Sequence, residues 1–426
     1  MRILLLNQTF YPDVVSTAQH LSDLALGLVA RGHEVTVVAS RRGYDAPQCR
    51  FERNEVWRGV RIVRVGSTGF GKGARWRRAV DFSSFLLACA ACVTRLPRQD
   101  VIVALTSPPL IGSLGARLAR MHRSRFVYWV MDLNPDEAIA AGWLRRGSVV
   151  ARLLEKLSRL TFERADQVVA LDRFMQERIV FKGVSREKVV VIPPWSHDAE
   201  VGWDEAGRAR FRKLHGLGDK FVVMHSGNHS PCHPLDTLLA AAERLRSDER
   251  VSFCFVGGGS EFQKVEHWAQ RTGQRNVLCL PYQSLGDLSA SLSAADLHVV
   301  VMGERFVGLV HPCKIYNALR IGVPILYIGP EASHITELAN ESCGRIYSAR
   351  HGQVGQIVEA VKRAREGGTR LEGRGLVAMN SRFSRETLLP RLVCEVVGPS
   401  EMRPGAEDKD DGLASAHASW TTGRPG

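Results

Sequence analysis

The sequence predicts an α/β protein built from two similar units, each with a parallel sheet covered by helices on both faces. Two observations lead to this prediction. Short apolar and β-branched runs alternate with amphipathic helical patterns through most of the 426 residues, and such strands are typical of parallel sheets buried on both sides. The pattern also pauses near residue 194 and then starts again, which indicates a second unit of the same kind.

The expected strands of the first half are separated by segments with helical periodicity. AQHLSDLALGLVARG (18–32) is a clear helix, because its apolar residues recur at intervals of three to four and so share one face. Gly32 closes this segment, where a glycine in the left-handed conformation commonly ends a helix. The strands are expected at residues 2–6, 34–39, 60–65, 101–105, 126–130, 168–171 and 189–193.

A polar segment rich in proline and glycine divides the chain. We interpret PPWSHDAEVGWDEAG (193–207) as a linker, which gives a first domain at residues 1–195 and a second at 196–382. The helical pattern at 383–397 is expected to pack back onto the first domain, and the polar tail at 399–426 to be disordered. Two such domains would face each other across a cleft formed by the carboxyl ends of their strands. The second domain's strands are expected at 221–226, 251–257, 277–281, 297–302 and 324–329.

Composition narrows the class of protein. With 45% hydrophobic and 24% charged residues the chain is of ordinary globular type, and no apolar run reaches the ~18–20 residues that cross a bilayer. The start, MRILLLNQTFYP, has no small-residue cleavage site, so we read it as a strand rather than a signal peptide and expect a cytoplasmic protein.

Nine scattered cysteines predict no disulfide framework. The CAAC motif at Cys89–Cys92 is interpreted as a pair of buried thiols.

The net charge of +13 and the isoelectric point near 9.6 predict an anionic partner. Much of the excess lies at residues 71–98 and 145–166, and the first segment places RWRR (75–78) before a run of apolar and small residues. A basic and aromatic cluster beside an apolar face suits a membrane interface, but a core helix with a solvated basic end fits the same pattern. Nucleic acid is not expected, because aromatic residues make up only 7% of the chain and no recognition motif is present.

The order of local motifs carries a family resemblance. The first half contains NQTFYPD, LTSPPL, WVMDLNPDE and ADQVVALDRFMQERIV, and the second contains HSGNHSPCHPLDTLLAAAERL, FVGGGSE and GLVHPCKIYNALRIGVPIL. Over about residues 1–397 the chain resembles family 4 glycosyltransferases, in the subgroup that acts in O-antigen, colanic acid and exopolysaccharide assembly. The resemblance implies the GT-B fold and a hexosyltransferase that retains anomeric configuration without a catalytic metal. The sequence likewise shows no histidine, cysteine or carboxylate cluster with metal-ligand spacing.

The loop after strand 221–226 is expected to bind the donor diphosphate. Gly227 and Asn228 follow the strand directly, where backbone N–H groups can face a phosphate. Many relatives carry an Arg beside this glycine and a Lys five residues later, and the matching positions here hold Asn228 and His233. This is a departure from the family. His233 could still donate to a phosphate, whose charge would raise the pKa of the imidazole, although a plain polar loop remains an alternative.

The stretch GLVHPCKIYNALRIGVP (308–324) departs further from the family signature of two glutamates. Asn317 stands where the second glutamate holds the donor ribose, and an amide can bond to the same hydroxyls. Lys314 lies at the predicted start of the helix, and we propose that it neutralises the diphosphate in place of the missing cations. The backbone N–H groups expected to face the sugar or phosphate are those of Gly308, Leu309, Val310 and His311.

Other expected contacts follow from the resemblance. The nucleotide base is expected near Tyr282, and the diphosphate-sugar near Ser16 and Thr17, whose hydroxyls replace the usual glycines and could cap the following helix or bind an anion. Asp132, after strand 126–130, could orient or deprotonate an acceptor hydroxyl. Beside Asn134–Pro135 it could equally be a turn aspartate.

The expected function is therefore a retaining glycosyltransferase at the cytoplasmic face of the cell membrane. Its donor would be a UDP- or GDP-sugar, and its acceptor a lipid-linked saccharide used in surface polysaccharide synthesis. A soluble transferase acting on small molecules and a nucleotide-sugar epimerase of the same fold are the alternatives. An epimerase needs ionisable groups around the sugar, and no acid/base pair stands out in the sequence.

Overall fold

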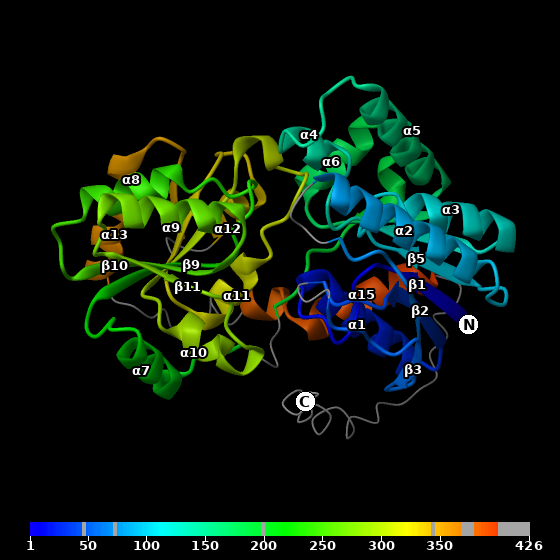
Figure 1. Ribbon diagram of the computed structural model, residues 1–426, viewed down its shortest axis with the longest axis horizontal. Coiled ribbons are helices and arrows are strands. Elements are labelled where there is room, and N and C mark those ends of the chain that lie inside the picture. Colours follow the sequence, from blue (N-terminus) through cyan, green and yellow to red (C-terminus); the bar gives the residue numbers. More distant parts are fainter. Residues whose placement is uncertain (45–47, 71–74, 197–200, 342–345, 368–378, 399–426) are drawn as a thin grey trace. The chain divides into compact units, whose positions relative to one another are not determined.

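The computed structural model describes residues 1–44, 48–70, 75–196, 201–341, 346–367 and 379–398 (Figure 1). Within these residues the chain forms two compact units. The first consists of Met1–Trp195, Arg305–His311 and Glu386–Gly398, and the second of Ser196–Glu304 and Pro312–Arg385. The short segment 305–311 therefore belongs to the first unit, although the sequence-based division placed it in the second.

The first unit has an eight-stranded sheet in the order β3-β4-β2-β1-β5-β6-β7-β8. Every pairing is parallel except that of β3 with β4. The central strand is fully enclosed, because Ile3, Leu4, Leu5 and Leu6 are all buried. The strands are β1 (Arg2–Leu6), β2 (Glu34–Ser40), β3 (Asn54–Trp57), β4 (Val60–Val65), β5 (Val101–Ala104), β6 (Arg125–Trp129), β7 (Gln167–Ala170) and β8 (Val189–Val191).

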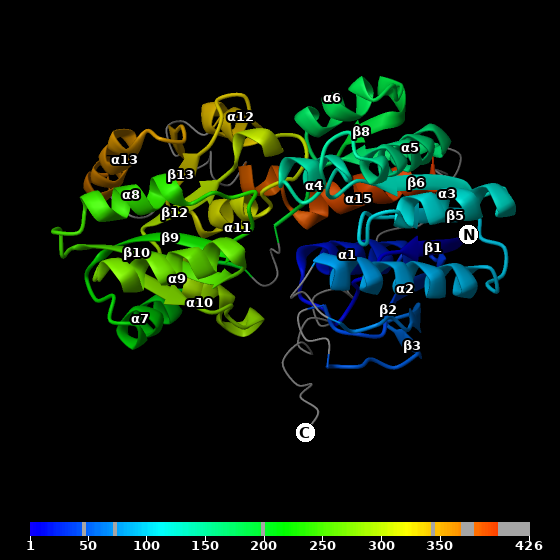
Figure 2. The same cartoon turned by 45° about the horizontal axis from the view of Figure 1, so that its top comes forward.

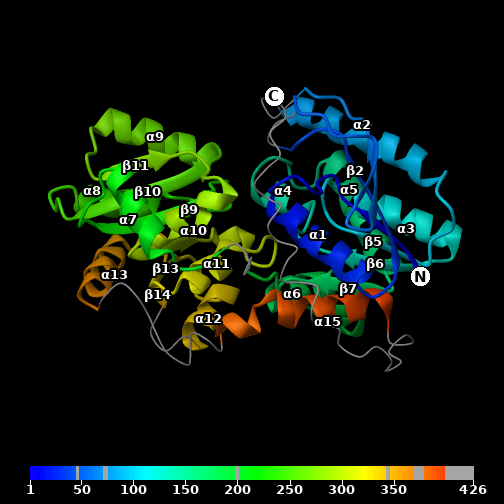
Figure 3. The same cartoon turned by 90° about the horizontal axis from the view of Figure 1, so that it is seen from below.

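Helices cover this sheet, and α2 and α3 run side by side along it (Figure 2). The C-terminal helix α15 belongs to the same unit (Figure 3). Leu389 of this helix packs against Gly27 of α1, and Arg125 donates to the carbonyl of Glu395. The helices are α1 (Ser16–Val29), α2 (Arg75–Val93), α3 (Ile111–His122), α4 (Asp136–Ala140), α5 (Val149–Arg164), α6 (Arg173–Phe181) and α15 (Arg385–Val397), with the 3₁₀ turns η1 (Arg186–Lys188) and η3 (Glu304–Phe306).

The second unit has a six-stranded sheet in the order β11-β10-β9-β12-β13-β14, and all its pairings are parallel. Its strands are β9 (Phe221–Asn228), β10 (Val251–Gly258), β11 (Val277–Leu280), β12 (Leu297–Val301), β13 (Ile325–Ile328) and β14 (Ile346–Ala349). Its helices are α7 (Glu205–Leu214), α8 (Asp236–Arg244), α9 (Ser260–Thr272), α10 (Leu288–Ser293), α11 (Lys314–Ile321), α12 (His334–Glu341) and α13 (Val354–Glu366), with η2 (Leu285–Asp287).

Alternate residues of β9 pack into different layers, as the pleat of a strand requires. Val223 joins a core formed with α8, α9 and α13, whereas Val222 and Met224 join one formed with α7 and the residues directly after α10. Burial on both faces explains why the strand is apolar almost throughout and could be located from the sequence.

The expected parallel fold is present in both units, and the expected strands match the observed ones to within a few residues at their ends. Gly32 has φ +79°, as expected for the residue that ends the first helical segment. Two strands, β3 and β14, were not expected. β3 (NEVW) lies at the sheet edge with partly exposed side chains, so it lacks the apolar run that identified the others. A turn at Arg58 and Gly59, both with positive φ, joins it to β4.

The proposed linker is shorter than its composition suggested. Trp195 is buried, and its indole donates to Asp23 at 2.8 Å, while Val201 is buried in the second unit. Residues 197–200 between them, and the tail 399–426 that we expected to be disordered, lie outside the described residues.

Both cysteines of the CAAC motif lie on α2 as free thiols, with Cys89 buried and Cys92 half-buried. Burial raises the pKa of the Cys89 thiol to about 12, which makes it unreactive. None of the helices in the described part of the chain is long and apolar enough to cross a membrane.

Candidate functional site

The strongest candidate for a ligand site lies at the carboxyl edge of the second unit's sheet. Lys314, the first residue of α11, is half-buried and reaches the end of β9. Its Nζ lies 3.1 Å from Nε2 of His225 and 3.3 Å from the carbonyl oxygen of Asn228. No described carboxylate forms an ion pair with this ammonium group.

Three histidines surround the lysine, and each is oriented by a backbone carbonyl. The Nδ1 atoms of His225, His229 and His233 lie 2.9, 2.7 and 2.6 Å from the carbonyl oxygens of Val299, Gly227 and Val301. Because a carbonyl can only accept, Nδ1 must carry the proton in each ring. The Nε2 atom of His225 is therefore the acceptor for the Lys314 ammonium group.

This environment disfavours positive charge before any ligand arrives. Burial, and then the charge of Lys314, hold the pKa of His225 and His233 well below the usual range and lower the pKa of His229 to about 3. Burial also lowers the pKa of Lys314 to about 7. Neutral imidazoles next to a half-buried lysine form a site that an anion would stabilise.

Glycines shape the backbone at this edge. Gly227 has φ +118°, and a Cβ atom there would contact the end of the Lys314 side chain. Gly257, with φ +139°, lies directly against the carbonyl of Gly227, so that any side chain would clash with backbone. The strand ends of β9 and β10 therefore approach each other as only glycine permits.

The other expected donor residues of this unit lie around the same edge or near it. Asn317 is half-buried one turn after Lys314 on α11, and its side chain has no hydrogen-bond partner among the described residues. Asn228 is exposed at the end of β9. The Tyr282 ring is exposed and its hydroxyl lies 3.4 Å from the carbonyl of Gly258. His233 is buried.

The segment 308–311 is held by the first unit, contrary to the sequence-based assignment. The N–H groups of Leu309 and Val310 donate to the carbonyl of Phe306, so they are not available to a sugar or phosphate. Gly308 packs against the backbone of Phe174. The buried His311 directs Nδ1 at Asp172 over 2.8 Å. The sequence could not show this, because the partner of His311 lies 139 residues away.

Ser16 and Thr17 are the first residues of α1 and do not cap it, because the N-cap position is Val15. Their hydroxyls contact other side chains: Ser16 Oγ lies 3.3 Å from His20 Nδ1, and Thr17 Oγ1 lies 3.1 Å from Thr9 Oγ1. The expected cap is therefore wrong. Both residues remain half-buried at the carboxyl edge of β1, where a ligand could reach them.

A pair of carboxyl groups lies at the carboxyl edge of the first unit's sheet. Asp132 follows β6 and is half-buried, and its carboxylate accepts no hydrogen bond from the described residues. Burial raises the pKa of Asp132 to about 6. Burial, and then the charge of Asp132, raise the pKa of Glu137 on α4 to about 8. At neutral pH Asp132 is mostly ionised while Glu137 keeps its proton, so the pair can accept and donate hydrogen bonds at once.

Two residues near this pair were not assigned to it from the sequence. Glu137 stands in the quoted motif WVMDLNPDE, and two acids after a buried strand were the signal that could have identified it. Arg78 was read only as part of a surface cluster, yet it is half-buried and its Nη2 lies 3.5 Å from the Tyr44 hydroxyl. The positive charge of Arg78 lowers the pKa of Glu137, but this effect is smaller than the increases caused by burial and by Asp132.

A metal site is not found within the described ranges, where no group of three histidine, cysteine or acidic side chains is arranged to hold an ion. His225, His229 and His233 direct Nδ1 at backbone carbonyls, and these contacts fix the orientation of the three rings beside Lys314.

Sequence comparison connects this architecture to known enzymes. Residues 17–195 match the glycosyl transferase 4-like domain, and residues 208–369 match the glycosyl transferases group 1. The putative colanic acid biosynthesis glycosyl transferase WcaI of Escherichia coli strain K12 is 27% identical over 387 residues, covering 85% of this chain and 92% of that protein. The probable glycosyltransferase WbjE of Pseudomonas aeruginosa is 25% identical over 261 residues, covering 61% and 65%.

Solved structures support the same fold. Anabaena HepE in complex with UDP and glucose superposes with a TM-score of 0.70 at 16% identity, covering 94% of this chain and all of that one. WaaG, a glycosyltransferase involved in lipopolysaccharide biosynthesis, superposes with a TM-score of 0.65 at 16% identity, covering 93% and 100%. The two units and their sites thus define a glycosyltransferase of the GT-B fold. The chain belongs to the family 4 glycosyltransferases and is similar to a putative colanic acid biosynthesis enzyme.

Proposed function

We propose that the protein is a retaining glycosyltransferase that moves a sugar from a UDP- or GDP-sugar to a lipid-linked saccharide at the cytoplasmic face of the cell membrane. The product would enter a cell-surface polysaccharide. The observation that carries the donor half of this proposal is the Lys314 ammonium group, which reaches the end of β9 without a carboxylate among its described neighbours. The group needs an anion, and a nucleotide diphosphate at a strand-end loop supplies one.

A solved structure of the same fold supports this choice of donor. HepE was solved with UDP and with UDP-glucose, which shows that the fold accommodates such a molecule. In the present chain Lys314 would neutralise the diphosphate, and Asn317, one turn further along α11, would bond the ribose hydroxyls. The metal-free reaction that we propose needs this positive charge from the protein, because the leaving diphosphate develops negative charge.

The carboxyl pair of the first unit would serve the acceptor. Ionised Asp132 would accept a hydrogen bond from the attacking hydroxyl and orient it, and protonated Glu137 would donate to a neighbouring oxygen of the same sugar. In the transfer, the acceptor oxygen bonds to the anomeric carbon as that carbon's bond to the diphosphate breaks. The electron pair of that bond leaves with the nucleoside diphosphate, whose leaving oxygen would take the proton of the acceptor hydroxyl.

A panel of UDP-, GDP- and dTDP-sugars in a thermal-unfolding assay tests the donor proposal. We expect one nucleotide to raise the melting temperature, because ligand at 100 times its Kd stabilises a protein by about 2.7 kcal/mol. The same nucleotide should give a much smaller shift with Lys314→Ala. If no nucleotide stabilises the wild-type protein, the donor proposal is wrong.

Asn317 provides a second check on the donor contacts. Asn317→Ala should weaken nucleotide-sugar binding about fivefold, since a hydrogen bond contributes about 1 kcal/mol, while Asn317→Glu should bind almost as the wild type does. Isothermal titration gives both affinities. A folded Glu variant that does not bind the donor would contradict the proposed ribose contact.

The membrane surface that we propose lies on α2. The sequence suggested either a core helix or a membrane interface here, and each interpretation fits a different face of the helix. Phe85, Cys89 and Val93 form the buried face of the helix. Trp76, Val80 and Leu87 are exposed at intervals of four and seven residues, which places them on the opposite face. Arg77 is exposed beside them, with its guanidinium over the Trp76 ring. Apolar and basic side chains on one outer helix face suit an anionic lipid interface.

Replacing two of these exposed residues should reduce membrane binding without affecting the fold. We expect Arg77→Glu combined with Leu87→Glu to lower co-sedimentation with anionic liposomes several-fold, because it removes one positive and one apolar contact. Lys362→Glu, at an exposed position of α13, is the control for a charge reversal away from α2. Equal loss in both variants, or none in either, would argue against an α2 interface.

A further inference from the structure

A second basic site lies at the edge of the second unit opposite Lys314, where the strands begin. An open cavity of about 720 Å³ is bounded by α7, the loop before β9, the residues that precede β10 and β12, and the end of α13. Its volume falls in the range of small-molecule sites. Six of the residues that line it are cationic and three are acidic. The cavity therefore carries an excess of positive charge. Whether its acidic residues neutralise its cations depends on which of them form ion pairs.

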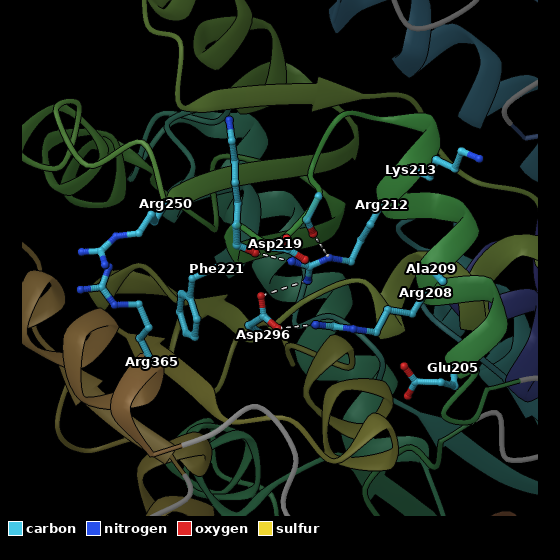
Figure 4. Close-up of a pocket in the computed structure, with 12 residues that line it drawn as sticks. Glu205, Arg208, Ala209, Arg212, Lys213, Asp219, Phe221, Arg250, Asp296 and Arg365 are labelled. Carbon is cyan, nitrogen blue, oxygen red and sulfur yellow. Dashed lines mark hydrogen bonds and ion pairs between the residues drawn. The ribbon is translucent and has the colours of Figure 1, made fainter.

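One side of the cavity holds two arginines that share a single carboxylate. Arg208 Nη2 lies 2.5 Å from one oxygen of the buried Asp296, and Arg212 Nη1 lies 3.0 Å from the other (Figure 4). The remaining bonds of both guanidinium groups go to backbone carbonyls, including those of Ala294 and Ala295. This part is rigid and well bonded, but it keeps one positive charge that no carboxylate neutralises.

The other side repeats the arrangement nearer to solvent. Arg365 Nη1 lies 2.8 Å from one oxygen of Asp248, and Arg250 Nε lies 3.5 Å from the other. The side chains of Arg250 and Arg365 converge at one end of the cavity in Figure 4. Lys213 and Lys220 also line the space, and neither has an ion-pair partner among the described residues. Arg208 and Arg212 have a structural role, because their bonds hold α7 against the rest of the unit. That role does not account for Arg250 and Arg365 at the other end of the cavity.

We propose that this cavity binds a small, soluble, phosphate-bearing anion, at a site separate from the donor edge. Guanidinium groups bind phosphate oxygens in a bidentate geometry. Arg250 and Arg365 supply two guanidinium groups that share a single carboxylate. The exposed aspartate and glutamate at the rim, Asp219 and Glu205, do not pair with these arginines. The ligand contacts are assigned to Arg250, Arg365 and Lys220, and the Asp296 network forms the fixed wall. The assignment does not depend on the proposed donor or acceptor.

Titration of the full-length protein with pyrophosphate tests this site. Because pyrophosphate would also occupy the donor edge, the measurement is made in wild type and in Lys314→Ala. We expect two binding events in wild type and one in Lys314→Ala. Adding Arg250→Ala and Arg365→Ala to that background should weaken the remaining event at least tenfold. A matched control adds Arg246→Ala and Arg363→Ala, which remove two exposed arginines of the same unit that pair with Glu243 and Glu359.

Two results of the titration would overturn the proposal. They are the absence of any pyrophosphate binding in Lys314→Ala and equal weakening of the remaining event by the control pair. If the Arg250 and Arg365 variant unfolds, Lys220→Ala replaces it and should weaken the event severalfold. Co-sedimentation with phosphatidylcholine vesicles that contain phosphatidic acid tests whether the site binds a lipid headgroup instead. Vesicle binding that depends on Arg250 and Arg365 would assign the site to a lipid headgroup rather than to a soluble anion.

Discussion

Lys314→Ala should weaken binding of the nucleotide-sugar donor between tenfold and a hundredfold. A hydrogen bond to a charged group contributes roughly 1.5–3 kcal/mol, and each 1.4 kcal/mol changes an affinity tenfold. The loss should be near the upper end, because Lys314 is the cation that reaches the end of β9 and the neighbouring His225 and His233 stay neutral. Isothermal titration with the nucleotide-sugar identified by the panel measures the effect.

Two controls separate loss of charge from loss of fold. Lys362→Ala removes an exposed lysine from α13 of the same unit and should leave donor affinity unchanged. Lys314→Arg keeps a positive charge at the site and should restore part of the binding. Donor affinity in Lys314→Ala within twofold of wild type would show that the diphosphate lies elsewhere.

Donor affinity should also decrease as the pH rises above neutrality. Burial lowers the pKa of Lys314 to about 7 in the ligand-free protein, and a bound diphosphate would raise it by stabilising the ammonium form. Below pH 7 the lysine already carries its charge, so the affinity is highest there. Above pH 7 binding must take up a proton, and Kd should rise by up to tenfold per pH unit until the pKa of the complex is reached.

The dissociation constant measured between pH 6 and pH 9 tests this dependence. The nearby histidines should contribute little to this dependence, because burial and the charge of Lys314 lower the pKa of each imidazole. Lys314→Arg should show a flat profile, since a guanidinium group stays protonated throughout. A wild-type profile as flat as that of Lys314→Arg would mean that Lys314 does not take up the proton.

Much of the fold could be predicted from the sequence because the chain buries its strands on both faces. β1 (RILLL) and β12 (LHVVV) are apolar along their length, so no alternation with polar residues was needed to find them. β3 is polar and half-exposed at a sheet edge, where burial does not dictate composition. Edge strands depend on their neighbours for pairing, and a single sequence carries little of that information.

The candidate site was predictable where a residue's role follows from its place on a local element. Lys314 begins a helix and Gly227 lies at the carboxyl end of a strand, and both positions could be read from the order of residues. His311, only three residues before Lys314, could not be assigned in this way, because its position depends on Asp172 in the other half of the sequence. The role of Glu137 depends on burial beside Asp132, which is likewise a property of the folded chain.

The segment 305–311 has a consequence for how such enzymes can be divided or recombined. The first unit is assembled from three stretches of chain, and residues 1–195 alone would leave Asp172 without His311 and α1 without the contact from α15. A chimaera of two relatives joined at the 195–196 boundary would therefore pair Asp172 of one parent with a segment 305–311 and a final helix from the other. Exchange of donor specificity between relatives should transfer residues 196–304 and 312–385 while keeping the parental 305–311 and 386–398.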